Sequence, residues 1–217
     1  MQIRVLIADD HRLVRLGLAR MVGRMSGIDV VGEADSGETA LALVRKERPN
    51  VVLMDLRMPG IGGLEATRRI VAMDPATRVL VVSACEDHPF PAQSIRAGAL
   101  GYVTKGASAE ELERAIRRVF AGQRFISDGV AQQLALRTFE ETADCPFDLL
   151  SNREMQITLM VIACRKVRQI SQELHLSPKT VNSYRYRIFE KLRVRSDVEL
   201  ALLAVRHGVV DQGRIAV

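Results

Sequence analysis

The clearest indication of the fold lies in residues 51–68, which read VVLMDLRMPGIGGLEATR. The four apolar residues Val51–Met54 are typical of a strand that is buried on both faces. The stretch from residue 63 onward has the period of an amphipathic helix, and Asp55 begins the turn between the two. We therefore expect a strand, a loop that starts with a carboxylate, and a helix, in that order.

The same alternation continues through the first 122 residues. Apolar, β-branched runs of strand length alternate with stretches of helical length, and Ser36 and Ser108 are capping signals for two of the helices. Since such strands form a parallel sheet covered on both faces, we expect a five-stranded, doubly wound α/β domain of the (βα)5 type. The predicted strands are residues 3–8, 30–34, 51–54, 79–82 and 101–104, and the predicted helices are residues 11–25, 37–48, 63–73, 91–98 and 108–121.

The pattern changes after Gly122. A short helix is predicted over residues 127–138, followed by an acidic stretch that contains Pro146 and has the composition of a hinge. From Leu149 onward only helical periods occur. We therefore expect three parts, which are an α/β domain over residues 1–122, a linker with one helix over residues 123–148, and an all-α domain over residues 149–217.

The composition excludes several classes of protein. Of the 217 residues, 47% are hydrophobic and 26% are charged, which is typical of a folded protein and not of a disordered chain, a collagen or a coiled-coil rod. No apolar run is long enough to span a bilayer, and the N-terminus lacks an apolar signal region, so we expect no membrane partner. Cys85, Cys145 and Cys164 have no paired spacing, which fits reduced thiols and argues against a disulfide scaffold or a zinc site. These features predict a cytoplasmic protein.

Positive charge is concentrated in the last third of the chain. Residues 149–217 carry 12 Lys and Arg against 6 Asp and Glu, while the net charge of the whole chain is +5. A small basic domain suggests a nucleic-acid partner. A solvated basic face without a ligand explains the charge alone equally well.

Charged and polar residues follow the ends of four predicted strands, where ligands bind in an open parallel sheet. They are the carboxylates Asp9, Asp10 and Asp55, the hydroxyl of Ser83 and the ammonium of Lys105. Three clustered carboxylates need a cation or raised pKa values, and hard oxygen ligands suit Mg²⁺. A carboxylate beside Mg²⁺ can attack phosphorus and form an acyl phosphate, whose oxygens the hydroxyl and the ammonium would hold. Each residue alone could be a strand-end cap or a surface charge, but the set predicts a phosphoryl-accepting pocket.

The basic C-terminal part has the pattern of a helix-turn-helix. Ser151 and Glu154 form a capping box that opens a helix to about Ala163. A second helix is predicted over about residues 167–174, and Ser177-Pro178 is an N-cap followed by proline at the first helical position. The third helix runs to about residue 193 and is the candidate recognition helix.

The helical period divides this third helix into two faces. Val181, Tyr184, Ile188 and Leu192 should face the core. The opposite face has amides, hydroxyls and a phenol for base edges, with cations for phosphates. A solvated amphipathic helix is the alternative. The outer face consists of Lys179, Asn182, Ser183, Tyr186, Arg187, Glu190 and Arg193, and the predicted DNA-binding residues within the motif at about Val167–Arg187 are Lys179, Thr180, Asn182, Ser183, Tyr186 and Arg187.

These motifs resemble a known family. The pocket residues, with VLVVSA ending at Ser83 and GYVTKG around Lys105, resemble the receiver domain of two-component response regulators over residues 1–122. The sequence LSNREMQ, with VRQISQELHLSPKTVNSYRYRIFEKL, resembles the LuxR/NarL-type helix-turn-helix over residues 149–213. Together they resemble the NarL/FixJ class, which implies a transcription regulator that is controlled by phosphorylation and activates genes.

The resemblance assigns roles to individual residues. It implies that a sensor histidine kinase phosphorylates Asp55, and that Mg²⁺ is bound by Asp10, Asp55 and the carbonyl of Arg57, with Asp9 reaching the ion through water. It further implies that Ser83 and Lys105 bind the phosphoryl group and that Tyr102 is an aromatic switch, although half-buried strand packing would also explain Tyr102. Many receivers have proline after the lysine, often in a cis peptide, whereas this chain has Gly106; a cis bond before a residue other than proline costs about 3 kcal/mol, so the sequence leaves the isomer at this bond open.

Two further expectations concern partners. Residues 86–102, 115–135 and 178–207 resemble one subgroup of global regulators, which implies a particular type of sensor kinase and activation of small regulatory RNA genes. The final helix, about residues 196–207, is apolar on more than one side, which suggests a homodimer contact. Complete burial within its own domain is the alternative.

A phosphatase-type enzyme and a nucleic-acid binder that ignores phosphorylation are the two alternatives to a regulator. An enzyme of the phosphatase type with an Asp nucleophile would place a D-x-D motif at the first strand, whereas this chain has adjacent Asp9 and Asp10 and its acceptor at the third strand. It also lacks a lid or cap domain. A nucleic-acid binder that ignores phosphorylation would not need the intact pocket. We therefore expect a regulator and not an enzyme.

Overall fold

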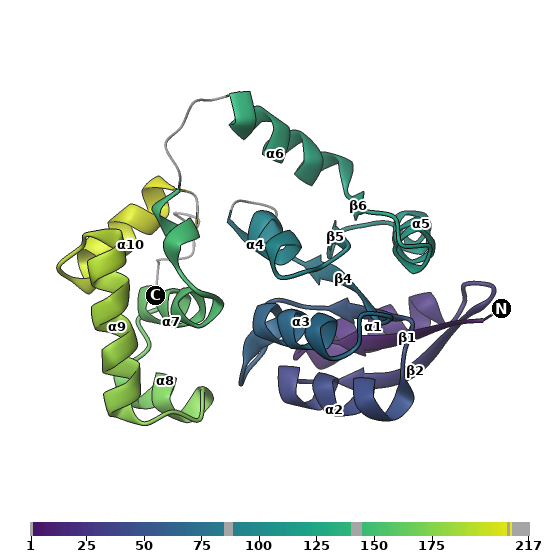
Figure 1. The fold of residues 1–217 in the computed structure, drawn as a ribbon, viewed down its shortest axis with the longest axis horizontal. Helices are drawn as coiled ribbons and strands as arrows, with labels where there is room; N and C mark the ends of the chain where they lie inside the picture. The colour runs from purple at the N-terminus through teal and green to yellow at the C-terminus, as the bar shows by residue number, and fades with distance from the viewer. Residues whose placement is uncertain (1, 85–88, 140–144, 208, 210–217) are drawn as a thin grey trace. The chain divides into compact units, whose positions relative to one another are not determined.

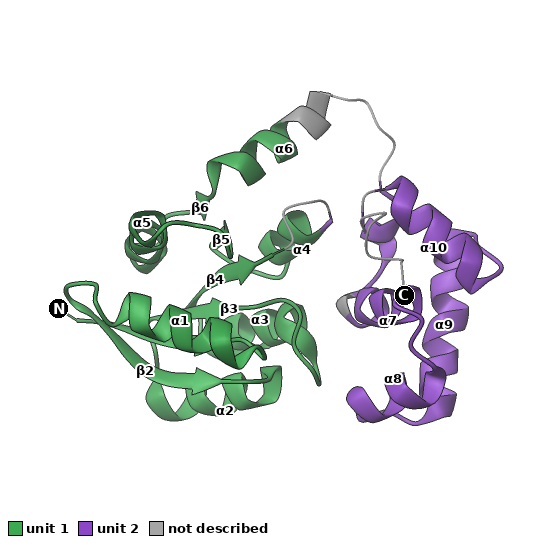
Figure 2. Cartoon of the chain, turned by 180° about the vertical axis from the view of Figure 1, so that it is seen from behind, with its two compact units in different colours: residues 1–86, 90–135 green, residues 87–89, 136–217 purple. Residues whose placement is uncertain are grey.

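The computed structural model describes residues 2–84, 89–139, 145–207 and 209 (Figure 1). The chain divides into two compact units (Figure 2). No helix among the described residues is long and apolar enough to cross a membrane. The first unit comprises residues 1–86 and 90–135, and the second comprises residues 87–89 and 136–217.

The first unit is built on a parallel sheet with the strand order β2-β1-β3-β4-β5-β6. α1 and α5 pack against one face, and α2, α3 and α4 cover the other (Figure 1). The doubly wound α/β fold predicted from the sequence is therefore confirmed, and its five predicted strands agree within two residues at each end. The strands are β1 Ile3–Ala8, β2 Ile28–Ala34, β3 Val51–Met54, β4 Arg78–Ser83, β5 Gly101–Thr104 and β6 Phe125–Ile126.

β6 is a strand that the sequence pattern did not predict. It consists of two residues, which is too short for any alternation to be recognised. It pairs in parallel with β5, so that Phe125 lies opposite Gly101 and Ile126 lies opposite Tyr102. The sheet therefore has six strands instead of five.

Two helices of the first unit, α2 and α5, begin at the capping serines that the sequence predicted. Ser36 accepts a hydrogen bond from the N–H of Thr39, and Ser108 accepts one from Glu111. α1 ends at Val22 with Gly23 as its C-cap, three residues before the end predicted from the apolar pattern, and Met25 is buried from a position outside the helix. The helices are α1 Arg12–Val22, α2 Gly37–Glu47, α3 Gly62–Met73, α4 Phe90–Arg96, α5 Ala109–Phe120 and α6 Asp128–Phe139.

The centre of the sheet forms the core of the first unit. Each residue of β3 is at most 1% exposed, and Val79–Val82 of β4 are similarly buried. Burial of each such side chain contributes about 1.5–3 kcal/mol to stability. This rigid centre fixes the positions of the residues that follow the strands.

The described residues of the second unit from Cys145 onward form a short 3₁₀ turn and four helices. The predicted capping box is present, since Ser151 N–H donates to Glu154 Oε2 at 2.7 Å and Glu154 N–H donates to the Ser151 hydroxyl at 3.3 Å. Phe147, which precedes residue 149, is fully buried. The elements are η1 Pro146–Leu149, α7 Asn152–Ile162, α8 Val167–Glu173, α9 Pro178–Leu192 and α10 Asp197–Arg206.

Two ion pairs fix α9 against its neighbours. Lys191 Nζ lies 2.6 Å from Oε2 of the buried Glu154 on α7. Arg185 donates from one nitrogen to both carboxylate oxygens of Asp197, at the start of α10, at 2.7 Å each. The orientation of α9 in this unit is thus held from two sides.

The structure describes two of the three cysteines. Cys145 is buried and Cys164 is exposed. Cys85 lies outside the described residues.

Candidate functional site

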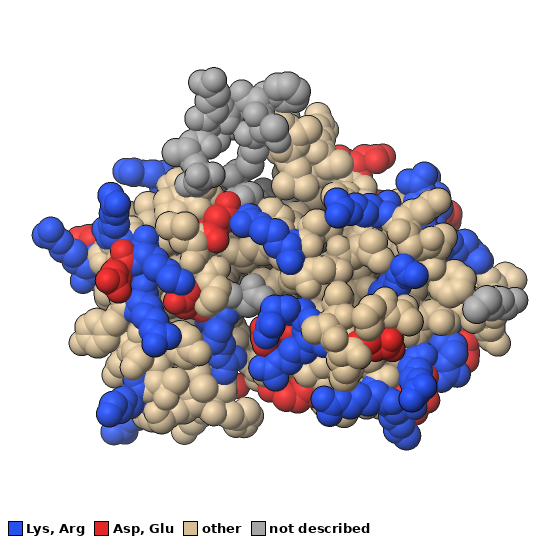
Figure 3. Space-filling model, in the orientation of Figure 1, with Lys and Arg blue, Asp and Glu red and all other residues tan. Residues whose placement is uncertain are grey.

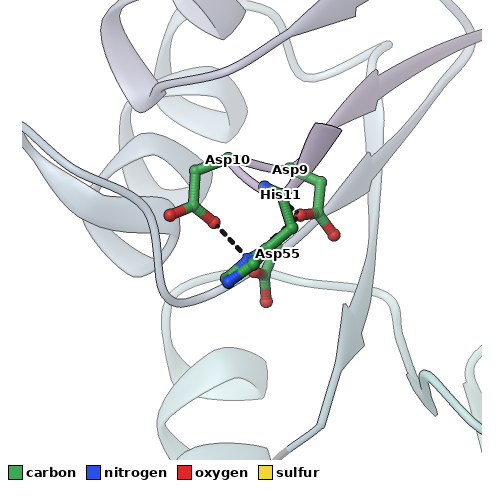
Figure 4. A group of neighbouring side chains, drawn as sticks. All are labelled: Asp9, Asp10, His11 and Asp55. Atoms are coloured by element: carbon green, nitrogen blue, oxygen red, sulfur yellow. Dashed lines mark hydrogen bonds and ion pairs between the residues drawn. The ribbon is translucent and has the colours of Figure 1, made fainter. Parts of the chain in front are cut away.

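Acidic side chains meet at the carboxyl ends of β1 and β3. Asp9, Asp10, His11 and Asp55 each offer a ligand atom, and these atoms lie within 4.8 Å of one another (Figure 4). Asp9 and Asp55 are buried, whereas Asp10 and His11 are exposed. The arrangement combines buried carboxylates with an opening to solvent.

The sheet itself brings Asp9 and Asp55 together. β1 and β3 are neighbours, and the N–H of Asp55 donates to the carbonyl of Ala8 at 2.8 Å. The N–H of Asp9 continues the ladder on the other side, with a bond of 3.0 Å to Ala34 at the end of β2. Both carboxylates therefore follow strands whose ends are level.

Lys105 joins the two buried carboxylates. Its Nζ lies 2.7 Å from Oδ2 of Asp9 and 2.9 Å from Oδ2 of Asp55. The N–H of Lys105 donates to the carbonyl of Ser83 at 2.9 Å, which connects the end of β5 to the end of β4. Asp9, Asp10, Asp55 and Lys105 thus follow β1, β3 and β5, and Ser83 ends β4, so the five residues predicted at strand ends lie at one edge of the sheet.

Burial and charge act in opposite directions on Asp55. Burial raises the pKa of Asp55 above its ordinary value, and the hydrogen bond and charge of Lys105 only partly offset this effect. For Lys105, burial alone would lower the pKa, but the bonds to Asp9 and Asp55 outweigh burial, so the pKa lies above its ordinary value. Lys105 is therefore held in its charged form beside the acceptor-like carboxylate.

The donor set fits a hard divalent cation. Asp9, Asp10 and Asp55 supply carboxylate oxygens, and the single ammonium of Lys105 leaves an excess of negative charge among them. Oxygen ligands in a site that is partly open to water suit Mg²⁺, which keeps several of its waters. His11 Nδ1 contacts Asp10 Oδ1 at 2.9 Å.

The sequence also predicted roles for Ser83, Tyr102 and Arg57. Ser83 ends β4 and is 1% exposed, and Tyr102 in β5 is fully buried, so that its ring occupies an inward position. Arg57 has an exposed side chain, whose guanidinium carbon lies 5.9 Å from the ring centroid of Phe90 on α4. The backbone of Arg57 also donates to Asp55, which lowers the pKa of that carboxyl.

Two residues beside the pocket have contacts that the sequence did not indicate. His11 is the N-cap of α1, and its backbone N–H donates to Asp9 Oδ1 at 2.8 Å. Arg15 Nη1 donates to the carbonyl of Asp9 at 2.6 Å. A single arginine on a helix carries no sequence signal for such a contact.

The second unit exposes the predicted outer face of α9. Tyr186 is 76% exposed, whereas Val181, Ile188 and Leu192 of the inner face are buried. Figure 3 shows many Lys and Arg side chains on the visible face of this unit. The exposed residues of the outer face are Lys179, Asn182, Ser183, Tyr186, Arg187, Glu190 and Arg193.

Two hydroxyls on α9 are engaged within the helix. The hydroxyl of Thr180 lies 2.8 Å from that of Ser177, whose oxygen caps the helix. Ser183 Oγ donates to the carbonyl of Lys179 at 3.0 Å. Asn182, Tyr186 and the cations have no such local bond in the geometry described, and they are the side chains best placed to reach a ligand.

Two family models match the chain. "Response regulator receiver domain" matches residues 5–117, and "Bacterial regulatory proteins, luxR family" matches residues 148–204. The response regulator GacA of Pseudomonas aeruginosa is 60% identical over 210 residues, which cover 96% of this chain and 98% of the relative. The response regulator UvrY of Escherichia coli K12 is 50% identical over 210 residues, with 96% of each chain covered.

Solved structures also resemble the chain. A two-component response regulator of the LuxR family from Aurantimonas sp. SI85-9A1 is 40% identical with a TM-score of 0.62, and the match covers 64% of this chain and 99% of that one. The response regulator ChrA of a heme-sensing two-component system is 29% identical with a TM-score of 0.55, covering 96% and 99%. RcsB from Salmonella enterica serovar Typhimurium, bound to promoter rprA, is 22% identical with a TM-score of 0.69, covering 94% and 98%, and supports the fold alone.

Proposed function

Because the chain belongs to the LuxR-type response regulators of two-component systems, which regulate transcription through a DNA-binding domain, we propose that Asp55 is the residue that its sensor histidine kinase phosphorylates. One observation carries this proposal. Asp55 is buried at the end of β3 with Lys105 at 2.9 Å and two further carboxylates within reach. We further propose residues 1–122 as the receiver domain, 123–148 as the linker and 149–217 as the DNA-binding domain.

The pocket supports phosphoryl transfer to Asp55 and not continuous turnover of a substrate. An Oδ atom of Asp55 forms a bond to phosphorus while the bond between phosphorus and the kinase's histidine nitrogen breaks. Lys105 and Ser83 then hold the phosphoryl oxygens. The product is an acyl phosphate on the chain itself, so the protein acts as a switched regulator and not as an enzyme.

A magnesium ion belongs to this proposal. Asp10, Asp55 and the carbonyl of Arg57 would hold Mg²⁺, with Asp9 reaching it through water. The bound cation would supply charge neutralisation at the phosphoryl oxygens. Tyr102 is the proposed aromatic switch, and its buried ring corresponds to the inward position.

The output is DNA binding by α9. Lys179 and Arg187 would contact phosphates, and Asn182, Ser183 and Tyr186 would reach base edges in the major groove. The exposure of these side chains supports the assignment. Thr180 remains in the proposed set through its position at the helix start, although its hydroxyl is bonded to Ser177.

A second copy of the chain is the proposed partner of α10. Val198 and Leu202 lie one turn apart and are 68% and 65% exposed, while Leu200 and Ala204 face the core. We propose that the exposed pair is covered in a homodimer of the phosphorylated protein. With Mg²⁺ and beryllofluoride, sedimentation should show a weaker dimer for Leu202→Ser than for Leu149→Ser, which changes another exposed leucine of the same unit.

The subgroup predicted from the sequence is that of GacA and UvrY, and the identities of 60% and 50% confirm it. We propose a sensor kinase of the GacS/BarA type as the phosphodonor. Activation of small regulatory RNA genes is the corresponding proposal for the output.

The phosphorylation assignment has a direct test. Asp55→Asn keeps the shape of the side chain and removes the nucleophilic carboxylate, so it should take up no acid-labile phosphate from the kinase. Asp74→Asn, which changes a carboxylate after α3, is the matched control and should be phosphorylated at the normal rate. Normal uptake by Asp55→Asn would show that the acceptor lies elsewhere.

A further inference from the structure

Arg15 connects the acidic pocket to a neighbouring strand. Its side chain is 17% exposed and projects from α1. Nη1 donates to the main-chain carbonyl of Asp9 at 2.6 Å, and Nε donates to Oε2 of Glu33 at 3.2 Å. Glu33 belongs to β2, which pairs with β1. One guanidinium thus joins the loop after β1 to the strand beside it.

The carbonyl of Asp9 has a particular significance because it belongs to the peptide that joins Asp9 to Asp10. A peptide unit is planar, so a fixed carbonyl oxygen also fixes the direction in which the chain enters Asp10. The carboxylate of Asp9 is held as well, by the N–H of His11 at 2.8 Å and by Lys105 at 2.7 Å. The carbonyl and Oδ1 of Asp9 thus each accept a hydrogen bond, and Oδ2 is ion-paired with Lys105.

We infer that Arg15 is a positioning residue for the metal pocket, which orients the Asp9–Asp10 peptide and thereby sets the affinity of the pocket for Mg²⁺. This inference rests on the proposed magnesium site. Its mechanism needs the planar fork of arginine, because two donors on one rigid group bind Asp9 and Glu33 at once. A lysine would keep the charge at this position but would lose the fixed pair of bonds.

The alternative is that Arg15 only stabilises the fold, and the chain contains a matched control for that possibility. Arg4 lies in the same strand β1 that leads to Asp9. Its Nη2 donates to the carbonyl of Glu47 at 2.6 Å and lies 3.6 Å from Oε2 of the same residue. Arg4 therefore also combines a carbonyl bond with a carboxylate contact, but on a different part of the first unit.

The experiment uses the full chain and two readouts. Mg²⁺ alone is titrated by calorimetry, and hydrogen exchange of the His11 amide is measured without metal. Loss of a residue that supports a metal ligand typically weakens metal binding by about tenfold or more, so we expect Arg15→Ala to weaken Mg²⁺ binding by about tenfold and to accelerate exchange at His11. Arg15→Lys should recover only a minor part of both effects, and Arg4→Ala should change neither by more than about twofold.

Several outcomes would overturn the inference. They are unchanged Mg²⁺ affinity and His11 exchange in Arg15→Ala, full rescue by Arg15→Lys, or an equal effect of Arg4→Ala. If the unmodified chain binds no Mg²⁺, the proposed metal site fails, and His11 exchange alone decides whether Arg15 positions the loop. If Arg15→Ala does not fold, Glu33→Gln takes its place, because it keeps Arg15 and neutralises the carboxylate that binds its Nε. Glu33→Gln should also weaken Mg²⁺ binding and accelerate exchange at His11.

Discussion

Nζ of Lys105 lies 2.9 Å from Oδ2 of Asp55, although 50 residues separate them in the sequence. The parallel sheet accounts for this contact, because β3 and β5 both flank β4 and their ends meet at one edge. Lys105 supplies the charge that opposes the effect of burial on Asp55. The proposed acceptor is thus prepared as a nucleophile by a residue from a distant strand.

The first prediction concerns this cation. Lys105→Met should slow phosphorylation of the chain by a small phosphodonor in excess Mg²⁺ by at least about tenfold. Without the ammonium, burial favours the protonated form of Asp55, and the phosphoryl oxygens lose a partner. Lys46→Met, which changes a lysine that is 77% exposed, should react at the normal rate. Equal rates for the two variants would contradict the role of Lys105.

The second prediction concerns the metal. Asp10→Ala should weaken Mg²⁺ binding by about tenfold or more, because it removes a hard oxygen ligand from a small set. Asp29→Ala changes an exposed carboxylate of β2 and should leave the affinity unchanged. Calorimetric titration with MgCl₂ gives the Mg²⁺ affinity of both variants. An unchanged affinity in Asp10→Ala would exclude Asp10 as a ligand.

The third prediction separates two roles on α9. Lys179→Ala should weaken binding to operator and random DNA alike and flatten the salt dependence, because a phosphate contact carries no sequence information. Asn182→Ala should cost about 1–3 kcal/mol on the operator and narrow the gap to random DNA. Binding of both variants to both duplexes across a salt series is the measurement. An unchanged specificity ratio for Asn182→Ala would place the base contacts elsewhere on the helix.

The fourth prediction concerns the ion pair between Glu154 and Lys191. Burial would raise the pKa of Glu154, but the hydrogen bond to Lys191 and the bonds to Ser151 outweigh burial, so the pKa lies below its ordinary value of 4.5. A carboxyl whose pKa is lower in the folded than in the unfolded protein stabilises the fold at pH values above its ordinary pKa. This stabilisation is lost as the pH falls through the pKa of the folded state. Lys191 is 40% exposed, so Lys191→Met should cost only about 1–2 kcal/mol near neutral pH.

This cost should shrink below the ordinary pKa of Glu154, where the carboxyl is protonated in both proteins. The free energy of unfolding of the full chain is measured in urea at each pH for both proteins, with hydrogen exchange of the α7 amides as the probe. The difference between the two proteins is the cost of losing the ion pair. Lys166→Met changes another exposed lysine of the same unit and should show no such dependence. A cost that is constant from neutral to acid pH would contradict the assignment.

Much of the first unit could be predicted because its strands and helices leave local patterns in the sequence. Central parallel strands are buried on both faces, so they appear as continuous apolar runs, and the ends of such strands meet at one edge. This is why Asp9, Asp55 and Lys105 could be grouped without coordinates. The outer face of α9 followed in the same way from the helical period.

Other features depend on contacts that no local pattern encodes. β6 is two residues long, and Met25, although buried like a residue of the helical face, lies beyond the end of α1. The hydroxyl of Thr180 is bonded at the N-cap, which periodicity alone could not indicate. The bond of Arg15 to the Asp9 carbonyl depends on the three-dimensional path of the loop after β1.

The two edges of the sheet also protect the chain against aggregation. β6 offers only two residues to another strand, and β2 carries the exposed charges of Asp29 and Glu33. Short or charged edges disfavour the addition of a strand from another molecule, which is the first step toward an amyloid-like ladder. The proposed association of two copies would therefore use side-chain surfaces and not main-chain pairing, which would keep it reversible.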